Sequence, residues 1–245
     1  MVLEYLLRAW KMYKNNAMSL VIAELLSLII SGIIALIGIS IIFNSIGIAN
    51  LTNLSNPELV VTKIIAILPV LAELGFASIF FIIAGLVWVF LKMGIYGMAS
   101  ESLRGITKVE TMLRVARKSG FKGIVSFIII GIITFFLFFI LIIVFNILLP
   151  IIGGIIGMVL FFLIIITFSL IFPGIIEDDF DPTRAIKESF SIAKKNYLEL
   201  LGLSLLYVVI SLVVFIPFIG IVIYCFVISP MIKISLVFFY KRKKI

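Results

Sequence analysis

Three ionisable residues lie inside long apolar stretches of this sequence and are the first candidates for chemistry: Glu24, Glu73 and Lys233. If these stretches cross a membrane, a charged side chain at the centre of a helix costs about 2.5–3.5 kcal/mol on insertion scales, so such residues are functional candidates. The 245 residues contain no histidine and one cysteine, Cys225. Histidine catalysis, histidine-ligated metal sites and disulfide frameworks are therefore excluded, and any chemistry must depend on carboxylates.

Glu24 and Lys233 are placed at similar depths by the sequence. Glu24 lies eight residues after Asn16 and Lys233 lies seven residues before Tyr240, which corresponds to roughly 10–12 Å below one membrane surface at 1.5 Å per residue. If the first and last spans are neighbours, the two residues can form a structural ion pair. The alternatives are that Lys233 extends independently to the interface, or that the residues form a substrate or proton site.

Glu73 lies deeper. It is ten residues inside the second apolar stretch counted from Lys63, roughly 15 Å from that end, and Pro69 four residues earlier loosens the backbone. We interpret Glu73 as a neutral acid that hydrogen-bonds to a neighbouring helix. The alternative is a proton or cation relay.

An acidic run lies outside the apolar stretches and consists of Glu177, Asp178, Asp179 and Asp181. Carboxylate oxygens can bind a divalent cation, but the run lacks the spacing of a calcium loop, so we interpret it as a solvated charge run. Phosphate-binding glycine loops, GxSxG and HExxH motifs are absent from the sequence. We therefore expect no catalytic residues, no metal ligands and no cofactor, and predict that the protein is not an enzyme.

The elements that position these residues follow from composition. The chain is 64% hydrophobic and 13% charged, whereas soluble domains are about 25% charged. At about 20 apolar residues per span, its length suits six transmembrane helices. We predict an all-α integral membrane protein with a single transmembrane domain over residues 1–245 and spans at about 17–43, 64–91, 123–149, 151–175, 197–216 and 218–240.

The basic residues predict the orientation. The segment before the first span, residues 92–122, residues 177–196 and the tail hold 18 of the 20 lysines and arginines. By the positive-inside rule, these segments and both termini are cytoplasmic in a plasma membrane. The net charge of +8 then favours anionic lipid headgroups over nucleic acid as a partner. Asn50 and Asn53 begin glycosylation sequons in the one sizeable loop on the opposite side.

Three similar segments precede the first, third and fifth spans: residues 6–16, 112–118 and 185–196. Each places apolar residues on one helical face and basic residues on the other, as in a helix that lies in the membrane interface. We predict three repeats of an amphipathic helix followed by two spans. Helix starts are indicated by Asp181-Pro182 and by a capping box from Thr107 to Glu110. The basic residues expected to contact lipid are Arg8, Lys11, Lys14, Arg114, Arg117, Lys118, Lys187, Lys194 and Lys195.

Four short segments carry a resemblance to a known group: Pro173 to Asp178, Ala185 to Phe190, Lys194 to Asn196 and Tyr240 to Arg242. They resemble a pattern shared by a broad group of prokaryotic six-span membrane proteins, and the resemblance implies an archaeal origin. That group includes the membrane domain attached to some glycerophosphodiester phosphodiesterases. The resemblance implies a six-span bundle but no phosphodiesterase activity, because the catalytic barrel of about 250 residues is missing.

Polar residues are rare in the predicted spans, and this favours a non-enzymatic role. We expect a lipid-contacting scaffold, or an accessory to another membrane protein, with the bilayer and its anionic headgroups as partners. The first alternative is a small-solute or ion transporter with Glu73 as the proton- or cation-linked group. The second is a lipid-modifying enzyme that uses Asp178 or Asp179.

Overall fold

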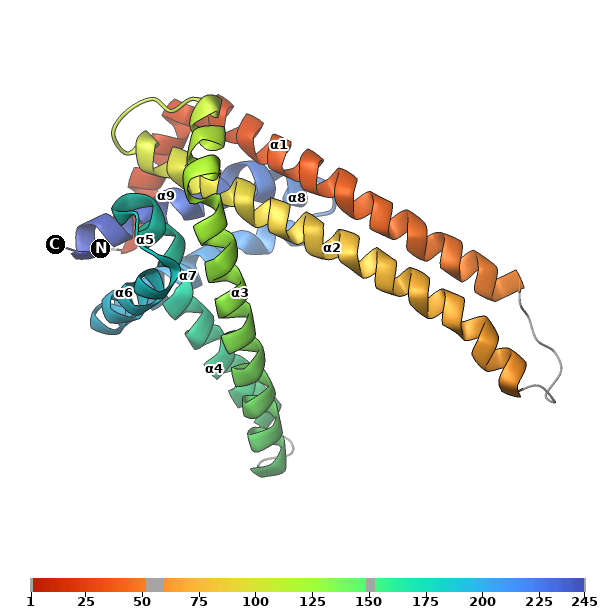
Figure 1. The fold of residues 1–245 in the computed structure, drawn as a ribbon. Coiled ribbons are helices and arrows are strands. Elements are labelled where there is room, and N and C mark those ends of the chain that lie inside the picture. Colours follow the sequence, from red (N-terminus) through yellow and green to blue (C-terminus); the bar gives the residue numbers. More distant parts are fainter. Residues whose placement is uncertain (1, 52–59, 149–152, 245) are drawn as a thin grey trace. The chain divides into compact units, whose positions relative to one another are not determined.

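The computed structural model describes residues 2–51, 60–148 and 153–244, and helices make up nearly all of these ranges (Figure 1). The described residues contain no strand, and six of their helical segments are long and apolar enough to cross a membrane, which confirms the all-helical prediction. The α-helices are α1 Val2–Leu51, α2 Val60–Ser102, α3 Val109–Leu148, α4 Gly153–Phe168, α5 Ile171–Asp178, α6 Pro182–Lys195, α7 Tyr197–Ser211, α8 Ile219–Ile223 and α9 Ser229–Lys244. A 3-10 turn, Leu212–Phe215, follows α7, and a π-helix, Tyr224–Ile228, joins α8 to α9. Residues Thr52, Asn53 and Ser55 of the sequons lie outside the described ranges.

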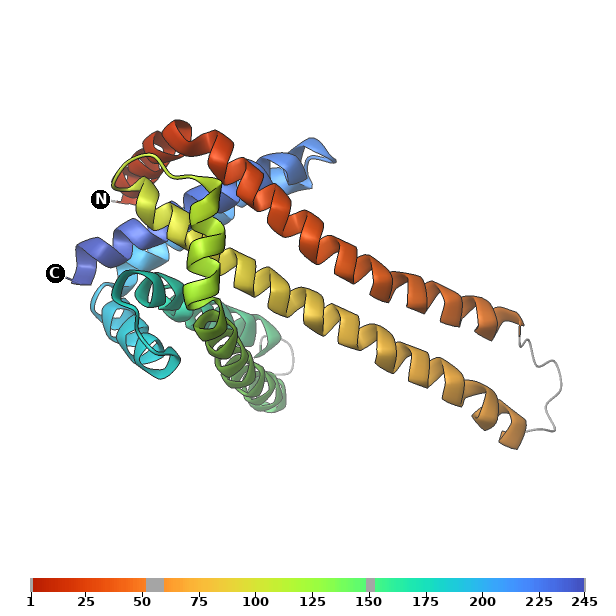
Figure 2. The same cartoon turned by 45° about the horizontal axis from the view of Figure 1, so that its top comes forward.

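The chain divides into two compact units. The first unit comprises Met1–Leu25 and Val89–Ile245, and the second unit comprises Leu26–Trp88. Within the second unit, the part of α1 after Leu25 and the part of α2 before Val89 run side by side as a helical hairpin (Figure 2). Gly38 makes this approach close, because a side chain there would meet Phe80, Phe81 and the backbone of Ala77.

Helix α2 extends further than the sequence predicted. The expected second span ended at residue 91 and a basic loop was expected over residues 92–122, but α2 continues to Ser102 and α3 begins at Val109. Lys92 is therefore a helical residue, and it is 8% exposed. The continuation is physically reasonable because the next residues, Met93 to Ala99, are nearly all apolar or small and pack in the core.

The segments that precede the spans are not all separate helices. Residues 6–16 and 112–118 are continuous with their spans in α1 and α3, and only α6 is a separate helix, which ends where Asn196 leaves helical geometry. On α1, a stripe of Tyr5, Ala9 and Tyr13 is buried at helical spacing. The threefold repeat stays a prediction.

Two prolines interrupt the later spans. The fourth span was predicted as one stretch over residues 151–175, but the helix breaks between α4 and α5, at residues 169 and 170, shortly before Pro173. The proline ring conflicts with the carbonyl of the residue four positions earlier, Ser169, so the break falls there. In the last span, the π-helix precedes Pro230 in the same way and widens the backbone where a regular turn would clash.

The predicted helix start at Asp181 and Pro182 is confirmed, because Asp181 is the extended N-cap residue and Pro182 the first residue of α6. The predicted capping box at Thr107 is wrong. The Thr107 hydroxyl donates instead to Glu101, at 2.7 Å. A longer α2 brings Glu101 to this position, and the charged acceptor makes the stronger hydrogen bond.

Close packing of α2 on α3 holds the first unit together. A side chain at Gly94 would collide with the backbone of Met112, and one at Gly97 would collide with Val115. Small residues allow two membrane helices to approach closely, and this replaces the hydrophobic force that is absent in lipid. Met93 enters a core cluster with Ile171, Ile175 and Ala185.

Candidate functional site

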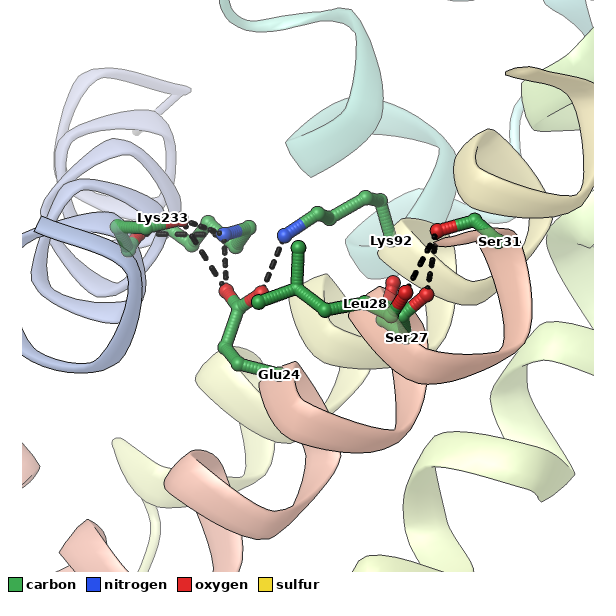
Figure 3. Close-up of polar contacts among 7 residues, drawn as sticks. Glu24, Ser27, Leu28, Ser31, Lys92 and Lys233 are labelled. Carbon is green, nitrogen blue, oxygen red and sulfur yellow. Dashed lines mark hydrogen bonds and ion pairs between the residues drawn. The ribbon is translucent and has the colours of Figure 1, made fainter. Parts of the chain in front are cut away.

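A buried charge cluster lies in the first unit, where Glu24 lies between Lys92 and Lys233 (Figure 3). Ser229 completes the cluster. The Lys233 ammonium donates to Glu24 Oε1 at 2.5 Å and to the Ser229 hydroxyl at 2.6 Å. The Lys92 ammonium donates to the other carboxylate oxygen, Oε2. The Ser229 hydroxyl lies 3.2 Å from Glu24 Oε1. Each carboxylate oxygen is therefore bound to a different lysine.

Three helices bring the cluster together. Glu24 continues the buried stripe of α1, and Lys92 lies on the extension of α2. Ser229 and Lys233 lie four residues apart at the start of α9, on one helical face. The π-helix directly before Ser229 sets the rotation of this face, and π-helices frequently occur at functional sites.

The charged residues of the cluster are almost fully excluded from solvent, and two of the three are positive. Glu24 is 1% exposed, and the lysines are 8% and 6% exposed. The predicted pairing of Glu24 with Lys233 is confirmed, and the alternative in which Lys233 extends to the interface is wrong. Sequence reasoning missed Lys92 because the residue was placed in a loop, although the apolar residues that follow it were a sign that the helix continues.

Glu73 belongs to the second unit. It lies on α2, where its side chain is half-buried. The interpretation of Glu73 as a neutral acid bonded to a neighbouring helix stays a prediction, and so does the alternative of a proton or cation relay.

The acidic run is more than a solvated charge run. Glu177 pairs with Lys241 at 2.9 Å, and Asp179 pairs with Lys122 at 3.0 Å. The Glu177 side chain is 7% exposed. Asp178 accepts hydrogen bonds from the Tyr240 hydroxyl and from the Lys244 ammonium. The carboxylates thus connect the α5–α6 junction to α3 and α9, and the interpretation as a merely solvated run is wrong.

Asp179 shows the electrostatic consequence. The Lys122 and Lys118 ammonium groups donate hydrogen bonds to its carboxylate, and this holds the pKa of Asp179 below its ordinary value of 3.8. Among the described residues, no group of three or more histidine, cysteine or acidic side chains is arranged to hold a metal ion.

The nine basic residues expected to contact lipid all have exposed side chains: Arg8, Lys11, Lys14, Arg114, Arg117, Lys118, Lys187, Lys194 and Lys195. Two of them also contact acidic residues, since Arg114 lies 3.3 Å from Glu101 and Lys118 lies 3.3 Å from Asp179. Exposure leaves all nine accessible to headgroups.

A groove of about 670 Å³ lies between α4, α7, α9 and the segment from the 3-10 turn to the π-helix. Its lining is mostly apolar, with Ile166, Val208 and Phe215 as representative residues. Five hydroxyl-bearing residues complete it: Ser169, Ser204, Tyr207, Ser211 and Tyr224. The Tyr207 hydroxyl is already bonded to the hydroxyl of Ser235, at 2.5 Å. We call this feature the apolar groove.

These features define a multi-pass helical protein of the membrane type, with its buried charges paired inside one unit. The chain belongs to the family described as a domain of unknown function (DUF7847), which matches residues 69–239. No curated protein and no solved structure matches the chain. The resemblance to the phosphodiesterase membrane domain and the archaeal origin receive no support from these comparisons.

Proposed function

We propose that this protein is a non-enzymatic, lipid-contacting scaffold or accessory protein in the plasma membrane of a prokaryote, with both termini in the cytoplasm. The apolar groove carries the proposal. Its described lining contains no aspartate, glutamate, lysine or arginine. Such a surface suits a hydrocarbon chain, whereas a transport site for a polar solute needs several convergent polar groups.

The buried charge cluster supports the same interpretation. A carboxylate that binds a transported cation must exchange its partners, but both oxygens of Glu24 are held by lysines within the protein. Fixing helix register is the best-attested role of buried polar and ionic groups that a protein retains, and we assign that role to this cluster. We place both termini in the cytoplasm because the basic segments, by the positive-inside rule, face that side of the membrane.

Filling the apolar groove tests the proposal. Val208→Trp adds a large side chain to the lining, and Val209→Trp on the same helix is the matched control, because Val209 is 63% exposed and is not part of the lining. Native mass spectrometry of the detergent-purified protein would count retained phospholipids. We expect Val208→Trp to lose bound lipid and Val209→Trp to retain it. Equal retention in both variants would contradict a lipid site in the groove.

Flux and turnover assays address the other functions. If reconstituted vesicles carried a proton or small-cation flux that Glu73→Gln abolished in a folded protein, the scaffold proposal would fail. Turnover of a lipid headgroup that was lost in Asp178→Asn would point to the enzymatic alternative. We expect neither activity.

A further inference from the structure

A second hollow, of about 410 Å³, lies at the end of the first unit where both termini are found (Figure 1). Three segments that are distant in sequence form it: the start of α1, the α2–α3 connection and the end of α9. We call it the basic hollow, and its lining consists of Glu4, Arg8, Leu103, Arg104, Phe238, Lys241 and Arg242.

The basic hollow carries more positive charge than its acidic neighbours neutralise. Arg242 pairs with Glu4 at 2.8 Å, while Lys241 and Arg104 share Glu177, at 2.9 and 3.7 Å. The Arg8 guanidinium lies 4.3 Å from the centre of the Phe238 ring. Four cations thus face two carboxylates, and guanidinium groups are well suited to phosphate because they can donate two parallel hydrogen bonds.

The apolar part of the lining distinguishes a lipid from a free anion. Leu103 and Phe238 are half-buried and lie among the cations. A phosphate ion would gain nothing from them, whereas the glycerol and first methylenes of a phospholipid would contact them. The hollow therefore offers charge for the headgroup and an apolar surface for the part of the lipid next to it.

The neighbouring surface of α1 places the basic hollow at headgroup depth. Leu3 and Leu7 are 60% and 58% exposed, beside Glu4 and Arg8, and need a hydrocarbon environment. Trp10 lies on the same outward surface, with the Lys14 ammonium 5.3 Å from its ring. Tryptophan and basic residues together are typical of the membrane–water boundary.

We propose that the basic hollow is a binding site for the phosphate headgroup of an anionic phospholipid. The proposal rests on the lipid contact proposed above, but it concerns a different surface and a specific headgroup. The anionic phosphate lies among Arg8, Arg104 and Arg242, and the glycerol part lies on Phe238.

Native mass spectrometry of detergent-purified protein, titrated with phosphatidylglycerol and with phosphatidylcholine of the same chains, tests the site. The triple variant Arg8→Gln, Arg104→Gln, Arg242→Gln removes three exposed cations of the hollow. The matched control, Lys108→Gln, Arg184→Gln, Lys244→Gln, removes the same charge from exposed positions that lie outside the basic hollow and outside the nine residues expected to contact lipid. We expect wild type to prefer phosphatidylglycerol over phosphatidylcholine. The hollow variant should bind phosphatidylglycerol at least roughly tenfold more weakly than wild type, and the control should bind it as wild type does.

Three results would overturn the proposal. They are equal weakening in both triple variants, equal binding of the two lipids by wild type, and displacement of phosphatidylglycerol by inorganic phosphate at equal concentration, which would indicate a soluble phosphate ligand. Arg8→Gln alone checks that the triple variant is not simply misfolded, because it should weaken binding severalfold with an unchanged elution profile. Lipid retained in the apolar groove, reported by Val208→Trp, tests the proposed function separately.

Discussion

Replacing Glu24 by glutamine should destabilise the first unit strongly. The substitution removes the carboxylate that separates two ammonium groups and leaves both lysines, 8% and 6% exposed, without that counterion. Removing one partner of a buried ion pair costs about 3–5 kcal/mol, because the remaining charge is uncompensated. For a chain of this size, each kcal/mol lowers Tm by roughly 2–4 °C, so we expect a decrease of about 10 °C.

The composition of the cluster makes the prediction asymmetric. Lys92→Met leaves Glu24 paired with Lys233, and Lys233→Met leaves it paired with Lys92. Each lysine variant therefore retains one balanced ion pair, and we expect it to lose less than half of the stability lost by Glu24→Gln. A variant with methionine at all three positions should unfold near the wild-type temperature, since apolar replacement of a complete buried ionic group is often neutral or stabilising.

Thermal unfolding of the detergent-purified variants, followed by tryptophan fluorescence and checked by gel filtration, measures these differences. Glu110→Gln serves as a control, because Glu110 is exposed and its loss should leave Tm unchanged. The reasoning is refuted if Glu24→Gln lowers Tm no more than the single lysine variants do. It is also refuted if the variant with three methionines is as unstable as Glu24→Gln.

Three further predictions concern packing, pH and topology. Gly94→Ala should lower Tm by several degrees in the same assay, because the added methyl group meets the backbone of Met112. Gly85→Ala is the control and should be neutral or slightly stabilising, since a side chain there has open space. Equal effects of the two substitutions would contradict the close approach of α2 and α3. The lowered pKa of Asp179, caused first by Lys122, contributes stability that is present above its ordinary value of 3.8 and is lost as the pH falls through the folded-state pKa. Wild type should therefore lose slightly more stability than Asp179→Asn in thermal scans below pH 4, and parallel profiles would refute the coupling. A fluorescent protein fused to the C-terminus and expressed in a bacterium should fluoresce, since the tail is predicted to be cytoplasmic, and a dark, exported fusion would reverse the proposed orientation.

The sequence by itself determined the features that depend on local composition. Apolar stretches of sufficient length must leave water, so six candidate spans were predictable from hydropathy. The start of α6 at Pro182 follows from proline's fixed φ angle and missing N–H group. Counting residues from the nearest polar boundary placed Glu24 and Lys233 at matching depths, since a helix rises by a constant 1.5 Å per residue.

Only the tertiary structure decided which residues meet. Lys92 pairs with Glu24 because α2 continues past its predicted end. The sequence of α2 alone could not reveal that a carboxylate of α1 compensates the charge of Lys92. The basic hollow unites Arg8, Arg104 and Arg242, which are separated by up to 234 positions in the chain. Composition and periodicity indicate the neighbours of a residue along its own helix. The charge cluster and the basic hollow arise instead from packing between helices, and no local sequence pattern specifies how helices are ordered around a bundle.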